Sequence, residues 1–212
     1  MRITVFGASG NVGSRVVAEA AARGHRVTAV LRDPSRPHRF PATVGTATGD
    51  ARDPADVRRL AAGQDLLVTA TRPAPGREDE LATATKGLLA GLAGTGVRLL
   101  VVGGAGSLVL PGGNGVTLVD SPGFPAALRP IADACGEQLA LCRADAEVDW
   151  TYLSPAALLE PGERTGRYRR GLDELVTGPD GTSAISMEDF AVALLDEAER
   201  PAHRRTRFTV GY

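Results

Sequence analysis

The chain has 212 residues, of which 43% are hydrophobic and 23% are charged, and its formal net charge is −1. This length suits one α/β domain with a large core, and the nearly neutral charge gives no basic field of the kind that nucleic-acid binding needs. The sequence has no long uncharged apolar run and no charged-then-apolar leader. We therefore expect a cytoplasmic protein with neither a membrane span nor a secretory signal.

The cysteine and histidine residues are few and widely spaced. Cys135 and Cys142 are seven residues apart in a predicted helix, and a rise of about 1.5 Å per residue separates them by roughly 10 Å. That distance is too long for a disulfide, so we expect two reduced cysteines. His25, His38 and His203 have no metal-ligand spacing, and we predict no metal site.

The first stretch of the chain has the pattern of a strand, a glycine turn and a helix. Residues 3–6 are β-branched or aromatic, and Gly7, Gly10 and Gly13 follow them. The helical pattern after the turn ends before Gly24. In this context the first glycine allows a tight turn, the second lets the backbone approach a pyrophosphate, and the third lets the helix lie close to the strand. The spacing G-x-x-G-x-x-G differs from the common G-x-G-x-x-G, but its position favours dinucleotide binding over a plain glycine-rich turn.

The end of the second predicted strand, 26–31, bears on which dinucleotide is bound. An acid at this place would accept hydrogen bonds from both adenosine ribose hydroxyls, whereas arginine suits a 2′-phosphate. Leu31 stands where the acid is expected, and Arg32 and Arg36 follow it. We therefore favour NADP(H) over NAD(H). Asp33 leaves the opposite choice open, although an aspartate before a proline is also typical of a turn, and the arginines could be solvated loop residues.

Strands and helices alternate along most of the chain, which predicts an α/β fold with a Rossmann-like, doubly wound parallel sheet flanked by helices. The expected strands are 44–48, 65–70, 97–102 and 150–153, and the expected helices begin at Asp53 and span 78–92 and 126–143. Residues 108–124 form a predicted loop beside the substrate. The core side of the helix over 126–143 is expected at Leu128, Ile131, Cys135, Leu139 and Cys142.

The last part of the chain, 156–212, departs from this alternation without a linker before it. A capping-box-like start at Ser186 predicts a helix, and residues 207–210 predict a final strand. We interpret residues 1–212 as a single NAD(P)-binding domain whose C-terminal extension completes the substrate side.

These motifs resemble those of the atypical short-chain dehydrogenase/reductase superfamily, especially its compact NmrA-like and biliverdin reductase B-like (flavin reductase) members. The matching segments are 7–13, 31–36, 49–50, 101–107, 150–155 and 185–191. The resemblance implies 2′-phosphate binding by the two arginines after the second strand and a cofactor site formed by Gly7, Ser9, Gly10, Asn11, Val12, Gly13, Arg32, Arg36, Asp50, Ala51, Ala70, Thr71, Arg72, Gly103, Gly104, Pro155 and Ala156. Within this set it places Asp50 and Ala51 at the adenine and Pro155 and Ala156 beside the nicotinamide.

The sequence departs from the superfamily at its usual proton-transfer pair. Most members use Tyr-x-x-x-Lys, in which lysine lowers the tyrosine pKa, whereas the single lysine here, Lys86, lies in a different predicted helix and 126–143 contains no tyrosine. We therefore favour an NADPH-dependent reductase of a conjugated small molecule, such as a flavin or a quinone, acting as a monomer or homodimer. Ser107 is the candidate hydroxyl, although it could simply bond its own backbone. A non-catalytic dinucleotide sensor of NmrA type is the alternative, and a sugar-nucleotide epimerase or dehydratase is disfavoured.

Overall fold

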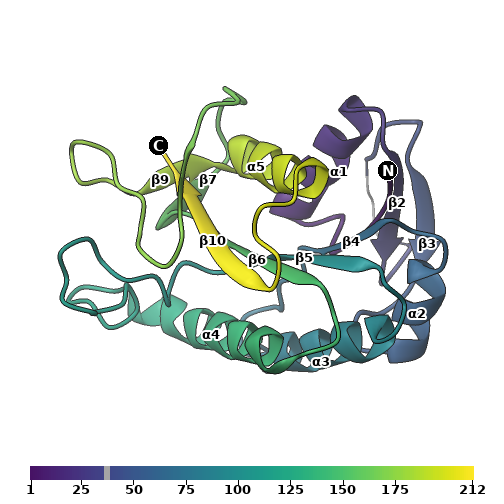
Figure 1. The fold of residues 1–212 in the computed structure, drawn as a ribbon, viewed down its shortest axis with the longest axis horizontal. Coiled ribbons are helices and arrows are strands. Elements are labelled where there is room, and N and C mark those ends of the chain that lie inside the picture. The colour runs from purple at the N-terminus through teal and green to yellow at the C-terminus, as the bar shows by residue number, and fades with distance from the viewer. Residues whose placement is uncertain (36–38) are drawn as a thin grey trace.

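The structure, a computed structural model, describes residues 1–35 and 39–212. A central sheet lies between two layers of helices (Figure 1). One layer contains α1 (Asn11–Ala22) and α5 (Met187–Glu199), and the other contains α2 (Pro54–Ala61), α3 (Glu80–Leu92) and α4 (Arg129–Ala144), which follows a short 3-10 turn, η1 (Ala126–Leu128). This arrangement covers both faces of the sheet, as a parallel sheet requires.

The sheet has eight strands in the order β3-β2-β1-β4-β5-β6-β10-β8. All neighbours pair in parallel except β8, which is antiparallel to β10. Its members are β1 (Arg2–Phe6), β2 (Arg26–Leu31), β3 (Gly45–Thr48), β4 (Leu66–Thr69), β5 (Arg98–Val102), β6 (Trp150–Ser154), β8 (Arg169–Gly171) and β10 (Thr206–Gly211). The predicted α/β, Rossmann-like fold class is confirmed.

Two hydrophobic layers hold the helices on the sheet, because alternate side chains of the buried strands point to opposite faces. Val5 and Leu66 pack in the layer below α1 and α5, together with Phe190 of α5. Phe6 and Leu67 pack in the layer against α2, α3 and α4. Continuous apolar strands in the sequence therefore correspond to strands buried on both sides.

Two helices begin at the caps expected from the sequence. The Asp53 carboxylate accepts a hydrogen bond from the Ala55 N–H at 2.8 Å, and Pro54 is the first residue of α2. The Ser186 hydroxyl accepts one from the Asp189 N–H at 3.0 Å at the start of α5. Each cap satisfies an N–H group that has no partner within its helix.

The prediction for the inner face of α4 is wrong at its beginning. Leu128 lies in η1, before the helix starts, and is 46% exposed, whereas Leu139 and Cys142 are buried as expected. The first turns of α4 pack on the glycine-rich loop that follows β5, because a Cβ at Gly106 would come within 2.9 Å of the Ala132 Cβ. The apolar face therefore meets the sheet only in its second half. Both cysteines are free thiols.

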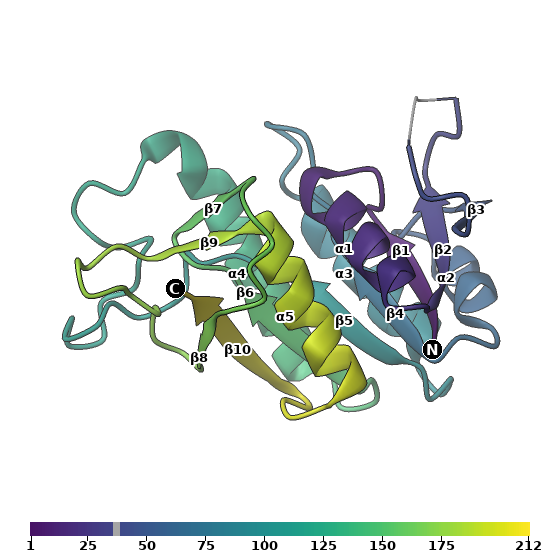
Figure 2. The same ribbon diagram turned by 90° about the horizontal axis from the view of Figure 1, so that it is seen from above.

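The C-terminal extension adds β10 and β8 to the main sheet and forms a small separate sheet of β7 (Leu158–Glu160) and β9 (Ala184–Ser186) (Figure 2). Asp189, which is fully buried, holds this part together. Its carboxylate accepts hydrogen bonds from the Gly166 N–H at 2.7 Å and the Tyr212 hydroxyl at 2.8 Å. Within the described residues, no helix is both long enough and apolar enough to cross a membrane.

Candidate functional site

The predicted site residues follow strands whose carboxyl ends meet at one edge of the sheet. Phe6 of β1 pairs with Thr69 of β4, and the turns after these strands touch each other. A Cβ placed on Gly7 would lie only 2.4 Å from the Ala70 carbonyl oxygen. The same edge receives the turns after β2, β3, β5 and β6, so the structure brings together the described members of the predicted set.

The three glycines of the first turn differ in how strongly the fold excludes a side chain at their positions. Gly7 has φ +73°, which a side chain disfavours, and a Cβ on Gly13 would lie 2.0 Å from the Gly7 carbonyl oxygen. Gly10 has φ −76°, and a Cβ there would meet nothing closer than the Gly7 oxygen at 3.2 Å. The fold itself therefore needs Gly7 and Gly13, whereas a side chain at Gly10 would make a tight contact only with the Gly7 oxygen.

Among the described residues, no side chain caps the N-terminus of α1. Gly10 is the N-cap and supplies no side chain, and the first turn contains no acidic residue. Ser9 and Asn11 are exposed beside it, and Val12 packs against the core layer below α1. Unpaired N–H groups and the helix dipole favour a bound phosphate at such a terminus. This geometry fits the pyrophosphate of a dinucleotide.

A pocket of about 360 Å³ lies next to this turn. Ser9, Leu31, Arg32, Asp33, Arg52 and Arg77 line it. The Asp33 carboxylate accepts a hydrogen bond from the Ser35 N–H at 3.0 Å, which is typical of the turn that the sequence offered as one interpretation of this aspartate. Arg36 lies outside the described residues.

Sequence reasoning missed two of these arginines. Arg52 follows β3, and Arg77 ends the turn between β4 and α3; neither belongs to a local motif, because only the fold brings the two turns together. Nε of Arg52 donates to both carboxylate oxygens of Asp50 at 3.0 Å, and Nη2 donates to one of them. This hydrogen bonding lowers the pKa of Asp50. Asp50 is therefore ionised and bound to Arg52, while its neighbour Ala51 is buried.

The turns after β4 and β6 hold further residues of the predicted set, of which Pro155 and Ala156 were predicted beside the nicotinamide. Ala70, Pro155 and Ala156 are buried, Thr71 is partly buried, and Arg72 is exposed. The Thr71 hydroxyl lies 3.1 Å from the hydroxyl of Thr69, which fixes its orientation.

Gly103 and Gly104 have a packing role in addition to any contact with a cofactor. A Cβ on Gly103 would lie 1.9 Å from Cε1 of Tyr152, and one on Gly104 would lie 2.7 Å from the Cβ of Cys135. These glycines therefore let the turn after β5 lie directly on β6 and α4.

Ser107 contacts a buried arginine that the sequence analysis did not single out. The Ser107 hydroxyl oxygen accepts a hydrogen bond from Nη1 of Arg207 at 2.8 Å. The Arg207 side chain is 4% exposed, and its Nε donates to Asp173 at 2.8 Å. Within the described part of the chain, no acceptor receives the Ser107 hydroxyl proton. No sequence signal connects the two residues, since they are 100 positions apart.

The three tyrosines of the chain are engaged in structural contacts. Tyr152 is buried and donates to the Cys135 carbonyl oxygen at 3.0 Å, and burial raises its pKa well above the ordinary value. Tyr168 donates to Asp196 at 2.6 Å, and burial together with this bond raises its pKa to about 12. Tyr212 is bound to Asp189. Tyr152 and Tyr168 therefore lack the lowered pKa of a proton-transfer tyrosine.

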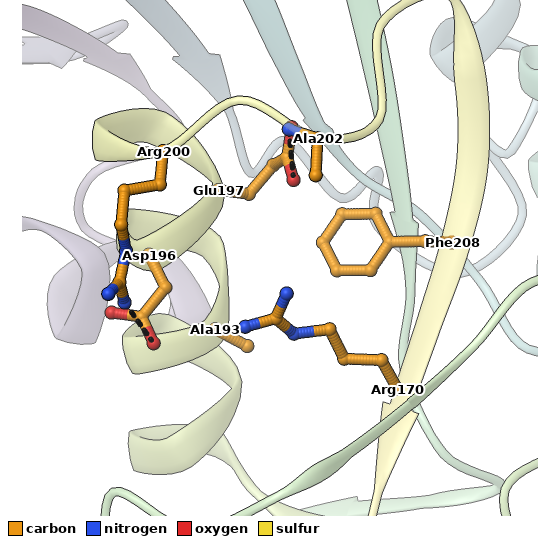
Figure 3. Close-up of a pocket in the computed structure, with 7 residues that line it drawn as sticks. All are labelled: Arg170, Ala193, Asp196, Glu197, Arg200, Ala202 and Phe208. Carbon is orange, nitrogen blue, oxygen red and sulfur yellow. Dashed lines mark hydrogen bonds and ion pairs between the residues drawn. The ribbon is translucent and has the colours of Figure 1, made fainter.

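A second pocket, of about 310 Å³, lies between α5 and the strands β10 and β8 (Figure 3). The two carboxylates that line it already accept hydrogen bonds from other side chains of the protein. Glu197 accepts hydrogen bonds from Arg98 and His203, and Asp196 accepts them from Arg23 and Tyr168. It lies on the face of the sheet that α5 covers, apart from the turns that carry the predicted residues, so the pocket beside the glycine turn is the candidate site.

Comparison with known proteins places this geometry among dinucleotide-binding proteins. The profile of a family described as NAD(P)H-binding matches residues 7–201. The uncharacterized protein YwnB of Bacillus subtilis is 38% identical over 212 residues, which cover 99% of this chain and 98% of that protein.

Two solved structures are similar over the full length of the chain. A Burkholderia pseudomallei protein named "putative exported protein" has a TM-score of 0.90 and 40% identity, and 100% of both chains is covered. A Streptococcus pneumoniae protein named "putative NADH-flavin reductase" has a TM-score of 0.89 and 32% identity, with 100% of this chain and 99% of that chain covered. The dinucleotide-binding family expected from the sequence is confirmed.

Proposed function

The chain belongs to the NAD(P)H-binding family, and from this premise we propose that it is an NADPH-dependent oxidoreductase that reduces a conjugated small molecule such as a flavin or a quinone. One observation carries the proposal. The edge that holds the glycine turn also holds an arginine-lined pocket, whereas the tyrosines that could have transferred a proton are engaged in structural contacts. Conjugated acceptors need mainly a well-placed ring.

Different residues of the chain bind the pyrophosphate, the 2′-phosphate and the nicotinamide of the cofactor. The N–H groups at the start of α1 bind the pyrophosphate, and Arg32 binds the 2′-phosphate. Pro155 and Ala156, buried at the end of β6, exclude water from one side of the nicotinamide. The reduced nicotinamide, when bound, supplies the hydride.

Ser107 is the proposed proton or hydrogen-bond donor to the acceptor. Its oxygen accepts a charge-assisted hydrogen bond from Arg207, which orients the hydroxyl and stabilises negative charge that develops on this oxygen. The hydroxyl hydrogen is then directed away from Arg207. A donor of this kind suits an acceptor whose ring spreads charge, because little acidity is required.

The name of the pneumococcal neighbour supports a flavin as the acceptor but specifies NADH rather than NADPH. A non-catalytic dinucleotide sensor remains the second candidate, favoured by the engagement of all three tyrosines. An epimerase is disfavoured because the single lysine, Lys86, lies exposed on α3 and forms no Tyr-x-x-x-Lys pair.

The test is a panel of acceptors mixed with the protein and either NADPH or NADH. We expect oxidation of NADPH with flavins or quinones and little with simple carbonyl compounds. Tight NADPH binding without oxidation by any acceptor would identify a sensor instead. A variant that cannot bind the dinucleotide, Gly10→Val, serves as the control for uncatalysed oxidation.

A further inference from the structure

One carboxylate holds three arginines in the pocket beside the glycine turn. Nη1 of Arg52 donates to Oε1 of Glu80 at 3.1 Å, and Arg77 donates to the same oxygen. Nη1 of Arg32 lies 3.9 Å from Oε2 of Glu80, which makes an ion pair without a hydrogen bond. The three guanidiniums come from the turns after β2, β3 and β4, so Glu80 connects three separate turns.

The backbone of α3 keeps Glu80 in this position. Gly87 lies two turns after Glu80 on the same face of α3. A Cβ on Gly87 would lie 2.4 Å from the Ala51 carbonyl oxygen and 2.8 Å from the carbonyl carbon of Arg52. The helix therefore rests directly on the turn that carries Arg52, and Glu80 cannot move relative to that turn without loss of this packing.

The three arginines differ in how many of their N–H donors remain available to a ligand. Arg52 uses Nε and both terminal nitrogens for Asp50 and Glu80. Among the contacts of the described residues, Arg77 uses one nitrogen and Arg32 makes only the long ion pair. Their side chains are 61% and 60% exposed and line the pocket. Arg77 and Arg32 thus retain donors that face an incoming anion from two sides.

We propose that Arg77 and Arg32 form a two-arginine clamp for the 2′-phosphate of NADP(H), with Glu80 as the positioning residue for Arg77; this inference rests on the proposed function. A phosphomonoester carries a charge of about −1.5 to −2 at pH 7 and three strong acceptor oxygens. Guanidinium groups bind such oxygens through pairs of parallel hydrogen bonds. A clamp from two turns determines cofactor choice more strictly than Arg32 alone, because NADP(H) gains hydrogen bonds from two guanidinium groups and NAD(H) has no phosphate there to accept either.

The experiment measures binding by calorimetry with two probes that lack the nicotinamide, 2′,5′-ADP and 5′-AMP. Arg77→Ala should weaken 2′,5′-ADP binding roughly tenfold, since one charge-assisted contact is lost, and leave 5′-AMP binding unchanged. Arg32→Ala should have a similar effect. Arg200→Ala is the matched control, because Arg200 is 75% exposed and makes a comparable ion pair with Asp196 at 3.8 Å beside the other pocket (Figure 3).

The role of Glu80 is tested by repeating Arg77→Ala in a Glu80→Gln background. If Glu80 positions Arg77, the loss of 2′,5′-ADP affinity should shrink to less than roughly threefold there, as expected for coupled residues. An equal loss of affinity in both backgrounds would show that Glu80 does not position Arg77.

Three outcomes would overturn the clamp, and one of them also overturns the cofactor choice. Unchanged 2′,5′-ADP binding in Arg77→Ala, with a loss in Arg32→Ala, leaves the NADPH proposal intact and refutes the clamp. Equal losses for 2′,5′-ADP and 5′-AMP mean that Arg77 only supports its turn. A wild-type protein that binds both probes equally lacks a 2′-phosphate site, which refutes the NADPH preference together with the clamp.

Discussion

At the scale of single residues, Gly10 differs from the two other glycines of the first turn, because the fold does not require a glycine at this position. We predict that Gly10→Val abolishes dinucleotide binding, since the branched side chain occupies the pyrophosphate position. The free energy of unfolding should fall by about 1 kcal/mol at most, the cost of a poorer N-cap. Cofactor titration and thermal unfolding measure the two effects.

The control for this prediction is Gly13→Ala, whose Cβ would lie 2.0 Å from the Gly7 carbonyl oxygen. That variant should lose stability as well as binding. Unchanged affinity of Gly10→Val for both NADH and NADPH would contradict the cofactor site.

Ser107 is the second residue whose substitution separates binding from chemistry. Ser107→Ala removes the hydroxyl but leaves Arg207 paired with Asp173, so the fold and the cofactor site stay intact. We expect a lower kcat with nearly unchanged NADPH affinity. Steady-state kinetics with each accepted substrate provides the measurement, and wild-type rates throughout would return Ser107 to a purely structural role.

At the scale of elements, we predict opposite changes in stability when alanine replaces two glycines that lie in different helices. A Cβ on Gly91 of α3 would lie 2.6 Å from the Cβ of Val57 in α2, whereas one on Gly136 of α4 meets nothing within 4 Å. Gly136→Ala should stabilise the protein by about 0.5–1 kcal/mol through helix propensity. Gly91→Ala should destabilise it by about 1–3 kcal/mol through overpacking. Denaturant unfolding of both variants checks the difference, and equal shifts would contradict the close contact of α2 and α3.

How far the elements could be predicted depends on how local their causes are. The start of α2 at Asp53 and the turn at Gly7 follow from a few neighbouring residues, and the structure has both where they were expected. The exposure of Leu128 was not predictable, because periodicity does not tell whether a helix face meets the sheet or a loop. Arg77 and Arg207 were missed because only the fold brings Arg77 beside Arg32 and Arg52, and Arg207 beside Ser107. No spacing in the sequence records these contacts.

At the scale of the whole molecule, a buried ion cluster joins the start of β5 to the segment between α5 and β10. Nη2 of Arg98 lies 2.5 Å from Oε1 of Glu197, and Nδ1 of His203 lies 2.7 Å from Oε2. Burial opposes ionisation of Glu197, but the hydrogen bonds from His203 and Arg98 outweigh it and lower its pKa. Ionised Glu197 therefore contributes to the stability of the folded chain.

This cluster predicts a direction for the dependence of stability on pH. A carboxyl with a lowered pKa stabilises the fold above its unfolded value, here 4.5, and the contribution is lost as the pH falls through the lowered pKa. Glu197→Gln should cost about 3–5 kcal/mol near neutral pH, because it leaves the buried Arg98 with only the Asp149 carboxylate, 3.9 Å from its Nε, as a counterion. It should also flatten the loss of stability in acid. Unfolding free energies measured across this range check both, and an unchanged acid slope would contradict the role of Glu197.

The two edges of the eight-stranded sheet also differ in what they would offer to another chain. The β8 edge is only three residues long and presents Arg169 and Arg170, whereas the β3 edge, Gly45–Thr48, is largely exposed and has no charged side chain. Short strands and positive charges oppose strand addition. A second copy that approached edge to edge at β8 would bring like charges together, so protection against unwanted sheet extension is built into that side of the sheet. At β3 the strand is only four residues long, and Nη2 of Arg59 donates to the carbonyl oxygen of its last residue, Thr48, at 3.0 Å.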